Sequence, residues 1–151
     1  VHSKFGSVHA LIHLIGGWVG GKTIPESSRD DLEFMLNQHV WTTFNLFQSF
    51  APHIESTGWG RVIIVSQPVT VTPTAKSAIY AAAKSAQESM ALTLAEEYKD
   101  SGLTANIIHV KSIDIKESGK GTSPAEIVAA MMYLFSDEAN KVSGTRIPLY
   151  K

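Results

Sequence analysis

The sequence predicts an α/β fold in which a parallel sheet carries helices on both faces. Short runs of β-branched and apolar residues alternate with longer segments whose apolar residues recur at helical spacing. The short runs are apolar almost throughout, which is typical of strands buried on both faces of a parallel sheet. Because strand-helix-strand connections are right-handed, this alternation predicts a doubly wound sheet.

The elements are expected in the order strand, helix, strand, helix, strand, helix, strand. The run from Val8 to Ile15 stops at the turn Gly16-Gly17, and serine and acidic residues mark the start of a long helix near Ser28. The expected strands are residues 8–15, 61–65, 104–110 and 145–149, and the expected helices are residues 28–54, 77–99 and 123–135.

Length and composition restrict the possible classes of protein. The 151 residues are enough for one domain with its own core, so we expect a single domain over residues 1–151. With 44% hydrophobic and 18% charged residues the chain is globular, and its apolar runs are too short to span a membrane. The net charge of −1 argues against nucleic acid and anionic membranes as partners. Because the sequence has no cysteine and no leader-like start, the cytoplasm is the expected location.

Tyr80 and Lys84 are the two residues with the clearest chemical meaning. Positions four apart on a helix lie on one face, one turn from each other. A nearby ammonium favours the phenolate of a tyrosine, whose unperturbed pKa is about 10, so such a pair can move a proton near neutral pH. Taken alone, the spacing is also compatible with a chance pair on a helix.

The six histidines do not predict a metal site. His9 and His13 share one face of their expected strand, but no cysteine or cluster of carboxylates stands at ligand spacing. We therefore expect packing or surface histidines and assign no metal ligand.

Six segments around Tyr80 and Lys84 resemble, in order, the short-chain dehydrogenase/reductase family. They cover nearly the whole chain, and their ordered series is far more specific than any single motif. The segments are RVIIVS at 61–66, IYAAAKSA at 79–86, LAEE at 94–97, LTANII at 103–108, LFSDEA at 134–139 and VSGTRIPL at 142–149.

The resemblance implies a particular sheet. The family has a seven-stranded doubly wound sheet ordered 3-2-1-4-5-6-7, and the four expected strands correspond to its strands 4 to 7. The expected fold is therefore a partial Rossmann-like sheet, with the first three strands of the family fold absent from this sequence. The glycine-rich turn after strand 1, which lets backbone amides approach a pyrophosphate, is absent with them. We therefore expect this chain alone to bind a dinucleotide poorly.

The catalytic set of the family, Asn, Ser, Tyr and Lys, maps onto this sequence only in part. Tyr80 and Lys84 match it, and the resemblance implies that they form the proton-transfer pair. By spacing, the family's serine falls on Gln67, with Ser66 as its neighbour, and its asparagine falls on His39. We therefore consider Ser66, Gln67 and His39 as further candidates for catalytic roles.

The resemblance also implies NAD or NADP as cofactor. Without the phosphate-binding turn, this chain retains only residues for the nicotinamide side. The residues expected there are Gly16, Gly17, Tyr80, Lys84 and Ile113.

Two short segments resemble one branch of the family, the quinonoid dihydropteridine reductases. They are GGWVGG at 16–21 and QHVWT at 38–42. The activated quinonoid substrate of that branch accepts hydride readily, so a missing serine is tolerated there. The alternative is that Trp18 and Trp41 are ordinary packing aromatics.

The sequence is compatible with two functions. The first is an oxidoreductase that transfers hydride between NAD(P) and a small carbonyl, alcohol or quinonoid compound. The second is a truncated, cofactor-free oligomerising module without activity, whose apolar strand edge at 8–15 pairs with another polypeptide. The resemblance further implies a homodimer or tetramer formed through the helices at 28–54 and 77–99.

Overall fold

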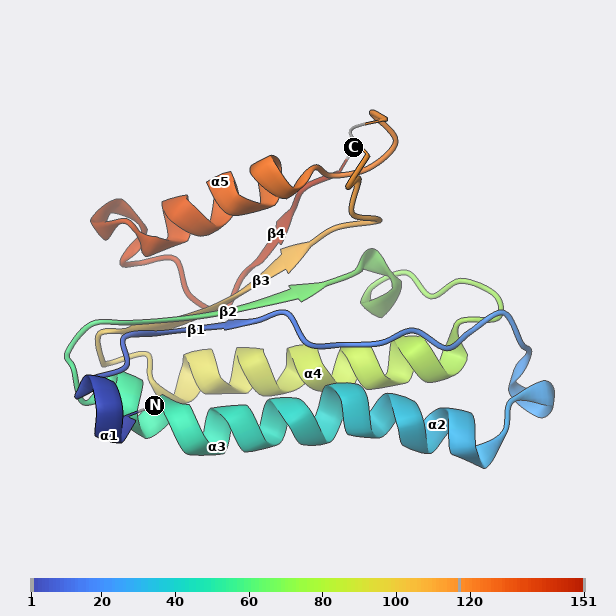
Figure 1. Ribbon diagram of the computed structural model, residues 1–151, viewed down its shortest axis with the longest axis horizontal. Coiled ribbons are helices and arrows are strands. Elements are labelled where there is room, and N and C mark those ends of the chain that lie inside the picture. Colours follow the sequence, from blue (N-terminus) through green and yellow to red (C-terminus); the bar gives the residue numbers. More distant parts are fainter. Residues whose placement is uncertain (1, 117, 151) are drawn as a thin grey trace.

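A four-stranded parallel sheet in the order β1-β2-β3-β4 forms the centre of the computed structural model, which describes residues 2–116 and 118–150 (Figure 1). The strands are β1 (Ala10–His13), β2 (Gly60–Ser66), β3 (Leu103–His109) and β4 (Arg146–Pro148). The helices are α1 (His2–Phe5), α2 (Arg29–Met35), η2 (Leu36–Trp41), α3 (Thr42–Glu55), α4 (Ala78–Glu97) and α5 (Pro124–Phe135). Short 3₁₀ turns form η1 (Ile24–Glu26), η3 (Pro68–Thr70) and η4 (Asp137–Ala139). The predicted order of strands and helices is confirmed.

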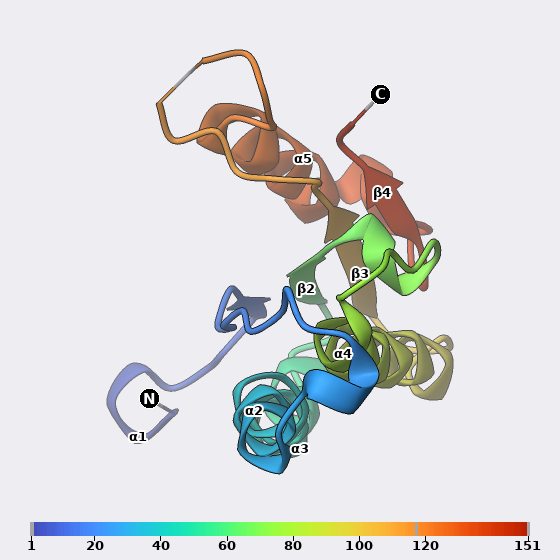
Figure 2. The same cartoon turned by 90° about the vertical axis from the view of Figure 1, so that its right-hand side faces the viewer.

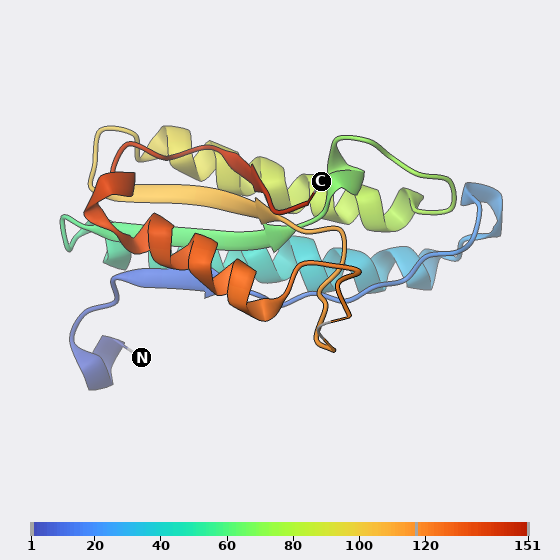
Figure 3. The same ribbon diagram turned by 90° about the horizontal axis from the view of Figure 1, so that it is seen from above.

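Helices cover both faces of the sheet, which confirms the predicted fold class. Figures 1 and 2 show α2, α3 and α4 on one face and α5 on the other, and the view from above in Figure 3 shows α5 crossing over the strands. Neighbouring residues of a strand point to opposite faces. Ile64 and Ile107 accordingly belong to the core with α3 and α4, whereas Ile63 and Ile108 pack beneath α5.

The first strand differs from the expected strand at residues 8–15. β1 is four residues long, and among the described residues it pairs with β2 alone, at the edge of the sheet. Ile12 is 43% exposed, and His13 is the single buried residue within β1. The prediction of a strand buried on both faces is therefore wrong for β1, because the apolar core beneath α5 takes residues from β2, β3 and β4 but not from β1.

The helix predicted at 28–54 is present but is not uniform. The Ser28 side chain accepts a hydrogen bond from the Asp31 backbone N–H at 3.1 Å and so caps the helix start. From Arg29 to Glu55 the segments α2, η2 and α3 follow one another directly, and η2 is π-helical. Such π-helical turns are frequent at functional sites, and this one contains His39.

Arg61 joins the start of β2 to the end of α5 from a buried position, being only 1% exposed. Its Nε donates to the carbonyl oxygen of Leu134 at 2.8 Å, and its Nη1 donates to the carbonyl oxygen of Gly60 at 2.8 Å. The guanidinium lies 4.3 Å from the centroid of the Trp59 ring. One side chain thus satisfies main-chain acceptors from two separate elements.

Replacing Arg61 with lysine should destabilise the fold. Lysine keeps the charge but lacks the planar fork of donors, so the buried carbonyl groups lose hydrogen bonds. We expect the free energy of unfolding, measured by urea denaturation, to fall by about 2–4 kcal/mol. Arg29→Lys is the matched control, because the Arg29 side chain is 88% exposed and its helical ion pair contributes only about 0.3–0.5 kcal/mol. Equal losses in the two variants would contradict the assignment.

Candidate active site

A pocket of about 580 Å³ lies at the carboxyl ends of the parallel strands, between them and α5. Open parallel sheets bind their ligands at this edge. The structure brings every site residue predicted from the sequence into the wall of this one pocket. They are Gly16, Gly17, His39, Ser66, Gln67, Tyr80, Lys84 and Ile113.

Tyr80 lies in the first turn of α4 and is 7% exposed. Its ring meets that of His39 edge to face, with 5.9 Å between the ring centroids. Burial raises the pKa of the Tyr80 phenol above its ordinary value. This differs from the expectation that Lys84 lowers it, because desolvation of the phenolate is the dominant effect in the structure.

Lys84 follows one turn later on α4 and is equally buried, at 7% exposed. Its Nζ donates to the carbonyl oxygen of Val65 at 2.9 Å and to Oε1 of Gln87 at 2.9 Å. Burial lowers the pKa of Lys84 to about 8, while the nearby Glu88 carboxylate acts in the opposite direction. The ammonium therefore remains the main form at neutral pH.

His39 points from the π-helical segment η2 toward the glycine turn and is 1% exposed. Its Nε2 lies 2.8 Å from the carbonyl oxygen of Gly17 and 3.3 Å from the Gly17 backbone nitrogen. The carbonyl oxygen can only accept, so the shorter contact favours the ring proton on Nε2. Nδ1 is buried without a hydrogen-bond partner among the described residues. Burial is the largest of the effects that lower the pKa of His39, which favours the neutral ring near pH 7.

The glycine turn is shaped to accept this histidine. A Cβ atom added at Gly16 would stand 2.6 Å from Cε1 of His39, closer than real Cβ atoms approach a neighbour. A Cβ at Gly17 would stand 3.2 Å from the Phe34 ring. Gly16 is thus required for the close approach of His39, which gives this predicted site residue a packing role as well.

Ser66 and Gln67 end β2 with side chains that have different partners. The Ser66 hydroxyl is buried and donates to Oε1 of Glu88 at 2.5 Å. Nε2 of Gln67 donates to the carbonyl oxygen of Lys111 at 3.0 Å. The suggestion that Ser66 replaces the family's serine therefore has no support in this geometry, because its hydroxyl is already committed to a buried carboxylate.

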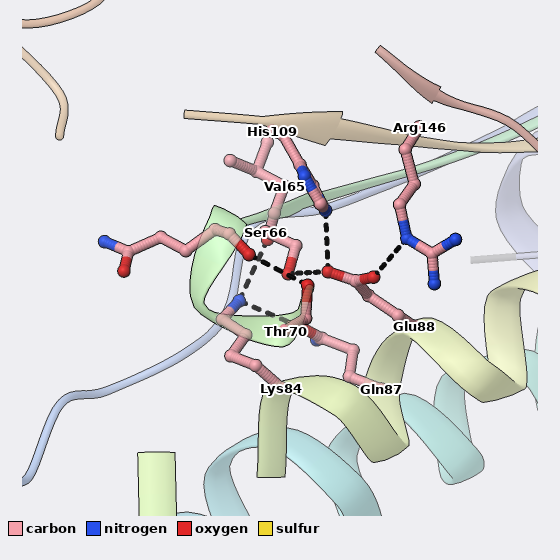
Figure 4. A network of polar contacts seen from close by, with 9 residues as sticks. Val65, Ser66, Thr70, Lys84, Gln87, Glu88, His109 and Arg146 are labelled. Carbon is pink, nitrogen blue, oxygen red and sulfur yellow. Dashed lines mark hydrogen bonds and ion pairs between the residues drawn. The ribbon is translucent and has the colours of Figure 1, made fainter. Parts of the chain in front are cut away.

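Glu88, which sequence reasoning did not assign, is the centre of a buried polar network (Figure 4). At 1% exposure it accepts hydrogen bonds from Ser66, from His109 Nε2 at 2.8 Å and from Arg146 Nε at 2.6 Å. Burial alone would raise the pKa of Glu88, but these donors together lower it to about 2. Glu88 stands four residues after Lys84, which places both side chains on one face of α4. This spacing is the sequence signal that could have identified Glu88.

Ile113 belongs to the loop after β3. It forms an isolated parallel bridge with Thr122 and is 52% exposed. This half-exposed apolar side chain therefore stands at the mouth of the pocket.

Neither metal-ligand clusters nor membrane-spanning helices are found in the described ranges 2–116 and 118–150. No group of three or more metal-ligating side chains gathers there. No helix in these ranges has the length and apolar character needed to cross a bilayer.

Comparison with known proteins identifies the family. The family model described as short chain dehydrogenase matches residues 1–123. A tropinone reductase homolog of Arabidopsis thaliana is 26% identical over 151 residues, which cover 99% of this chain and 51% of that protein. An acetoacetyl-CoA reductase of Allochromatium vinosum is 24% identical over 166 residues, covering 99% of this chain and 67% of that protein. A solved structure described as a dehalogenation enzyme superposes with a TM-score of 0.87 at 21% identity, over 97% of this chain and 69% of that one.

The chain belongs to the short-chain dehydrogenase/reductase family. It spans about half the length of the two tropinone reductase homologs that it matches, 51% and 54%. The predicted membership is confirmed, and the local resemblance to quinonoid dihydropteridine reductases stays a prediction.

Mild acid should destabilise the protein through His13, which is 2% exposed. Burial, aided by the charge of Lys84, lowers the pKa of His13 from 6.5 to about 4. Between these values the unfolded chain binds a proton that the folded chain does not, so stability falls as the pH drops. Between pH 7 and pH 5 the loss from His13 is on the order of 2 kcal/mol in urea denaturation.

His13→Gln tests this origin. The variant should lose part of the pH dependence of unfolding between pH 7 and pH 5, whatever its stability at pH 7. His9→Gln is the matched control, because His9 is exposed just before β1. A pH dependence that is unchanged in His13→Gln would exclude His13 as its source.

Proposed function

We propose that the protein is an NAD(P)-dependent oxidoreductase that acts on a small carbonyl or alcohol compound, with Tyr80 as the proton donor. The observation that carries this proposal is the gathering of Tyr80, Lys84 and His39 in one pocket, at the carboxyl ends of the strands. Membership of the family supports it. A nicotinamide cofactor, when bound, supplies or accepts hydride.

The residues of the pocket fit the nicotinamide side of such a cofactor. The glycine turn lets main chain approach the pocket closely, as Gly16 does toward His39. Lys84 uses two of its three N–H donors within the protein, which leaves one for a ligand oxygen. Ile113 and Met131 add apolar wall, as a planar ring requires.

Tyr80 is suited to donate a proton rather than to accept one at neutral pH. Burial raises the pKa of its phenol, so the hydroxyl keeps its proton until an alkoxide develops beside it. Lys84 stands on the same face of α4, and its positive charge favours the phenolate left after the transfer. The reduction direction is therefore the one that the electrostatics of this pocket favour.

The absence of a free serine hydroxyl bears on the substrate. Ser66 is held by Glu88, so a carbonyl bound here is not polarised by that hydroxyl. A substrate that is already activated, such as a quinonoid ring, requires less polarisation than a simple ketone. We propose this substrate class, in accordance with the glycine and tryptophan turn at 16–21.

Replacing Tyr80 with phenylalanine should strongly reduce turnover while leaving cofactor binding intact. A positioned general acid contributes about 10²–10⁴-fold to the rate, so we expect kcat/KM with an o-quinone probe to fall by that factor. NADH and NADPH affinity, followed by fluorescence titration, should change little. Tyr133→Phe is the matched control, because Tyr133 is 50% exposed on α5 and does not line the pocket.

The same titration separates the two functions. Saturable binding of NADH or NADPH by the purified protein supports the oxidoreductase. If neither cofactor binds at millimolar concentration, the proposal fails and the cofactor-free module takes its place. The exposed apolar edge of β1, with Ile12 at 43% exposure, is the feature that favours that second candidate.

We further propose that the protein forms a homodimer through α3 and α4. An apolar groove of about 620 Å³ lies between these helices. Phe44 lines it and is 45% exposed, with its ring edge to face with Trp41 at 6.2 Å. Exposed apolar patches of this kind are typical of protein interfaces.

Phe44→Glu should therefore convert a dimer into a monomer, because it places a charge in the apolar centre of the interface. Light scattering coupled to size exclusion measures the mass directly. Met132→Glu, at a residue 64% exposed on α5, is the control and should leave the mass unchanged. A monomeric wild-type protein at micromolar concentration would refute the proposed interface.

A further inference from the structure

The Lys84 ammonium is held in place by two neutral oxygen atoms. Figure 4 shows its bonds to the carbonyl oxygen of Val65 and to the Gln87 side chain, both 2.9 Å long. An ammonium has three N–H donors in a tetrahedral arrangement. Two fixed bonds therefore fix the direction of the third, and this donor remains for a ligand because Lys84 lines the pocket.

Gln87 is held in one orientation by its own neighbours. It is 1% exposed, and its Oε1 accepts from Lys84, so Nε2 faces the other way and donates to Thr43 Oγ1 at 3.0 Å. The Thr43 hydroxyl donates to the main-chain oxygen of His39 at 2.5 Å. Having spent its single proton, Thr43 Oγ1 must accept both from Gln87 and from His13 Nε2 at 2.8 Å. A flipped amide would turn its NH₂ group toward the ammonium.

His13 closes this network from β1. Its Nδ1 accepts from the Ile15 backbone N–H at 3.3 Å, which leaves the ring proton on Nε2, as the bond to Thr43 requires. The Gln87 amide nitrogen also lies 3.0 Å from His13 Nε2. Both nitrogens donate to Thr43 Oγ1, so this approach is a contact between two donors and not a hydrogen bond. Protonation of His13 Nδ1 would place its N–H against the Ile15 backbone N–H, and two donors repel each other. The contacts of His13 therefore favour the neutral ring.

We propose that Gln87 is a positioning residue for Lys84: supported by Thr43 and His13, it holds the ammonium so that one N–H remains free to bind a ligand in the pocket. The identity of that ligand rests on the proposed function, but the contact between Gln87 and Lys84 does not. The amide of Gln87 does not ionise, so it orients the cation without neutralising it. The motif of Tyr80 and Lys84 carried no prediction for this position.

The charged and titratable groups around Lys84 come from α4, β1 and η2, and β4 adds Arg146 through Glu88. Tyr80 and Glu88 flank it on α4, and Glu88 is itself paired with Arg146 of β4. His13 comes from β1 and His39 from η2, and the charge of Lys84 acts on both of them. Of these groups Glu88 is the one whose charge favours the ammonium. A negative charge at position 87 would be a second charge that favours the Lys84 ammonium.

The test follows the Lys84 side chain directly, by NMR titration of protein labelled with ¹³C-lysine and with Lys84→Met used to assign the signal. In the wild type the pKa of Lys84 should be about 8. Gln87→Glu keeps the acceptor and adds an opposite charge, so the pKa of Lys84 should rise by about 1 to 3 pH units. Gln87→Leu removes the acceptor and should lower it. Met132→Glu, which adds the same charge at an exposed site on α5, should leave the titration unchanged.

Two outcomes overturn the inference. One is a Lys84 titration that stays at its wild-type position in both Gln87 variants, because a merely structural role changes stability and not the titration. The other is an equal shift in Met132→Glu, which would make the effect one of net charge. Where Gln87→Leu does not fold, Gln87→Glu alone decides.

Titration with NADH over pH 6 to 10 then connects the contact to binding. In Gln87→Glu, the pH above which NADH binding is lost should rise together with the Lys84 pKa measured by NMR. An alkaline limit that stays in place while the NMR titration moves would overturn the role of Lys84 positioning in ligand binding. If the wild type binds neither NADH nor NADPH, the proposed function fails, and the NMR result still decides whether Gln87 holds Lys84.

Discussion

The structure depends on one unusual constraint, which is that α4 places a polar face against the sheet. Lys84, Gln87 and Glu88 are each no more than 7% exposed on that face. Burying charged and amide groups costs several kcal/mol unless each finds partners. The fold meets this cost with hydrogen bonds from the strands, and so the strands are tied to the helix by directional bonds as well as by apolar contact.

These bonds reach all four strands and divide into two networks. Glu88 accepts from Ser66 of β2, His109 of β3 and Arg146 of β4, whereas Gln87 connects through Thr43 to His13 of β1. This arrangement gives the buried rings of His13 and His109 hydrogen-bond partners. The Ser66 hydroxyl has a single proton, so while it donates to Glu88 it cannot also donate to a substrate in the pocket.

The sequence predicted the order of elements because apolar periodicity and glycine turns are local signals. The site residues that it proposed line one pocket, because Tyr80 and Lys84 fixed the alignment with the family from which the other positions were counted. What it missed depends on contacts distant in sequence. The π-helical segment 36–41, which turns His39 toward Gly16, has no local signature. The partners of Glu88 come from three strands, so its role follows only from the assembled sheet. The shallow burial of Ile12 depends likewise on which strands α5 covers.

The two networks differ in charge: the Glu88 network contains an ion pair, whereas the direct partners of Lys84 are neutral. On the Glu88 side a carboxylate meets a guanidinium, so the charges compensate within the protein. On the Lys84 side the direct partners are a main-chain carbonyl and an amide, both neutral. Neutral partners orient the cation but leave its charge available. Because the ammonium is desolvated and incompletely paired, a ligand oxygen in the pocket meets a stronger field than it would at the surface. The neutral network beside Lys84 therefore supports the proposal that this pocket binds an oxygen-bearing ligand.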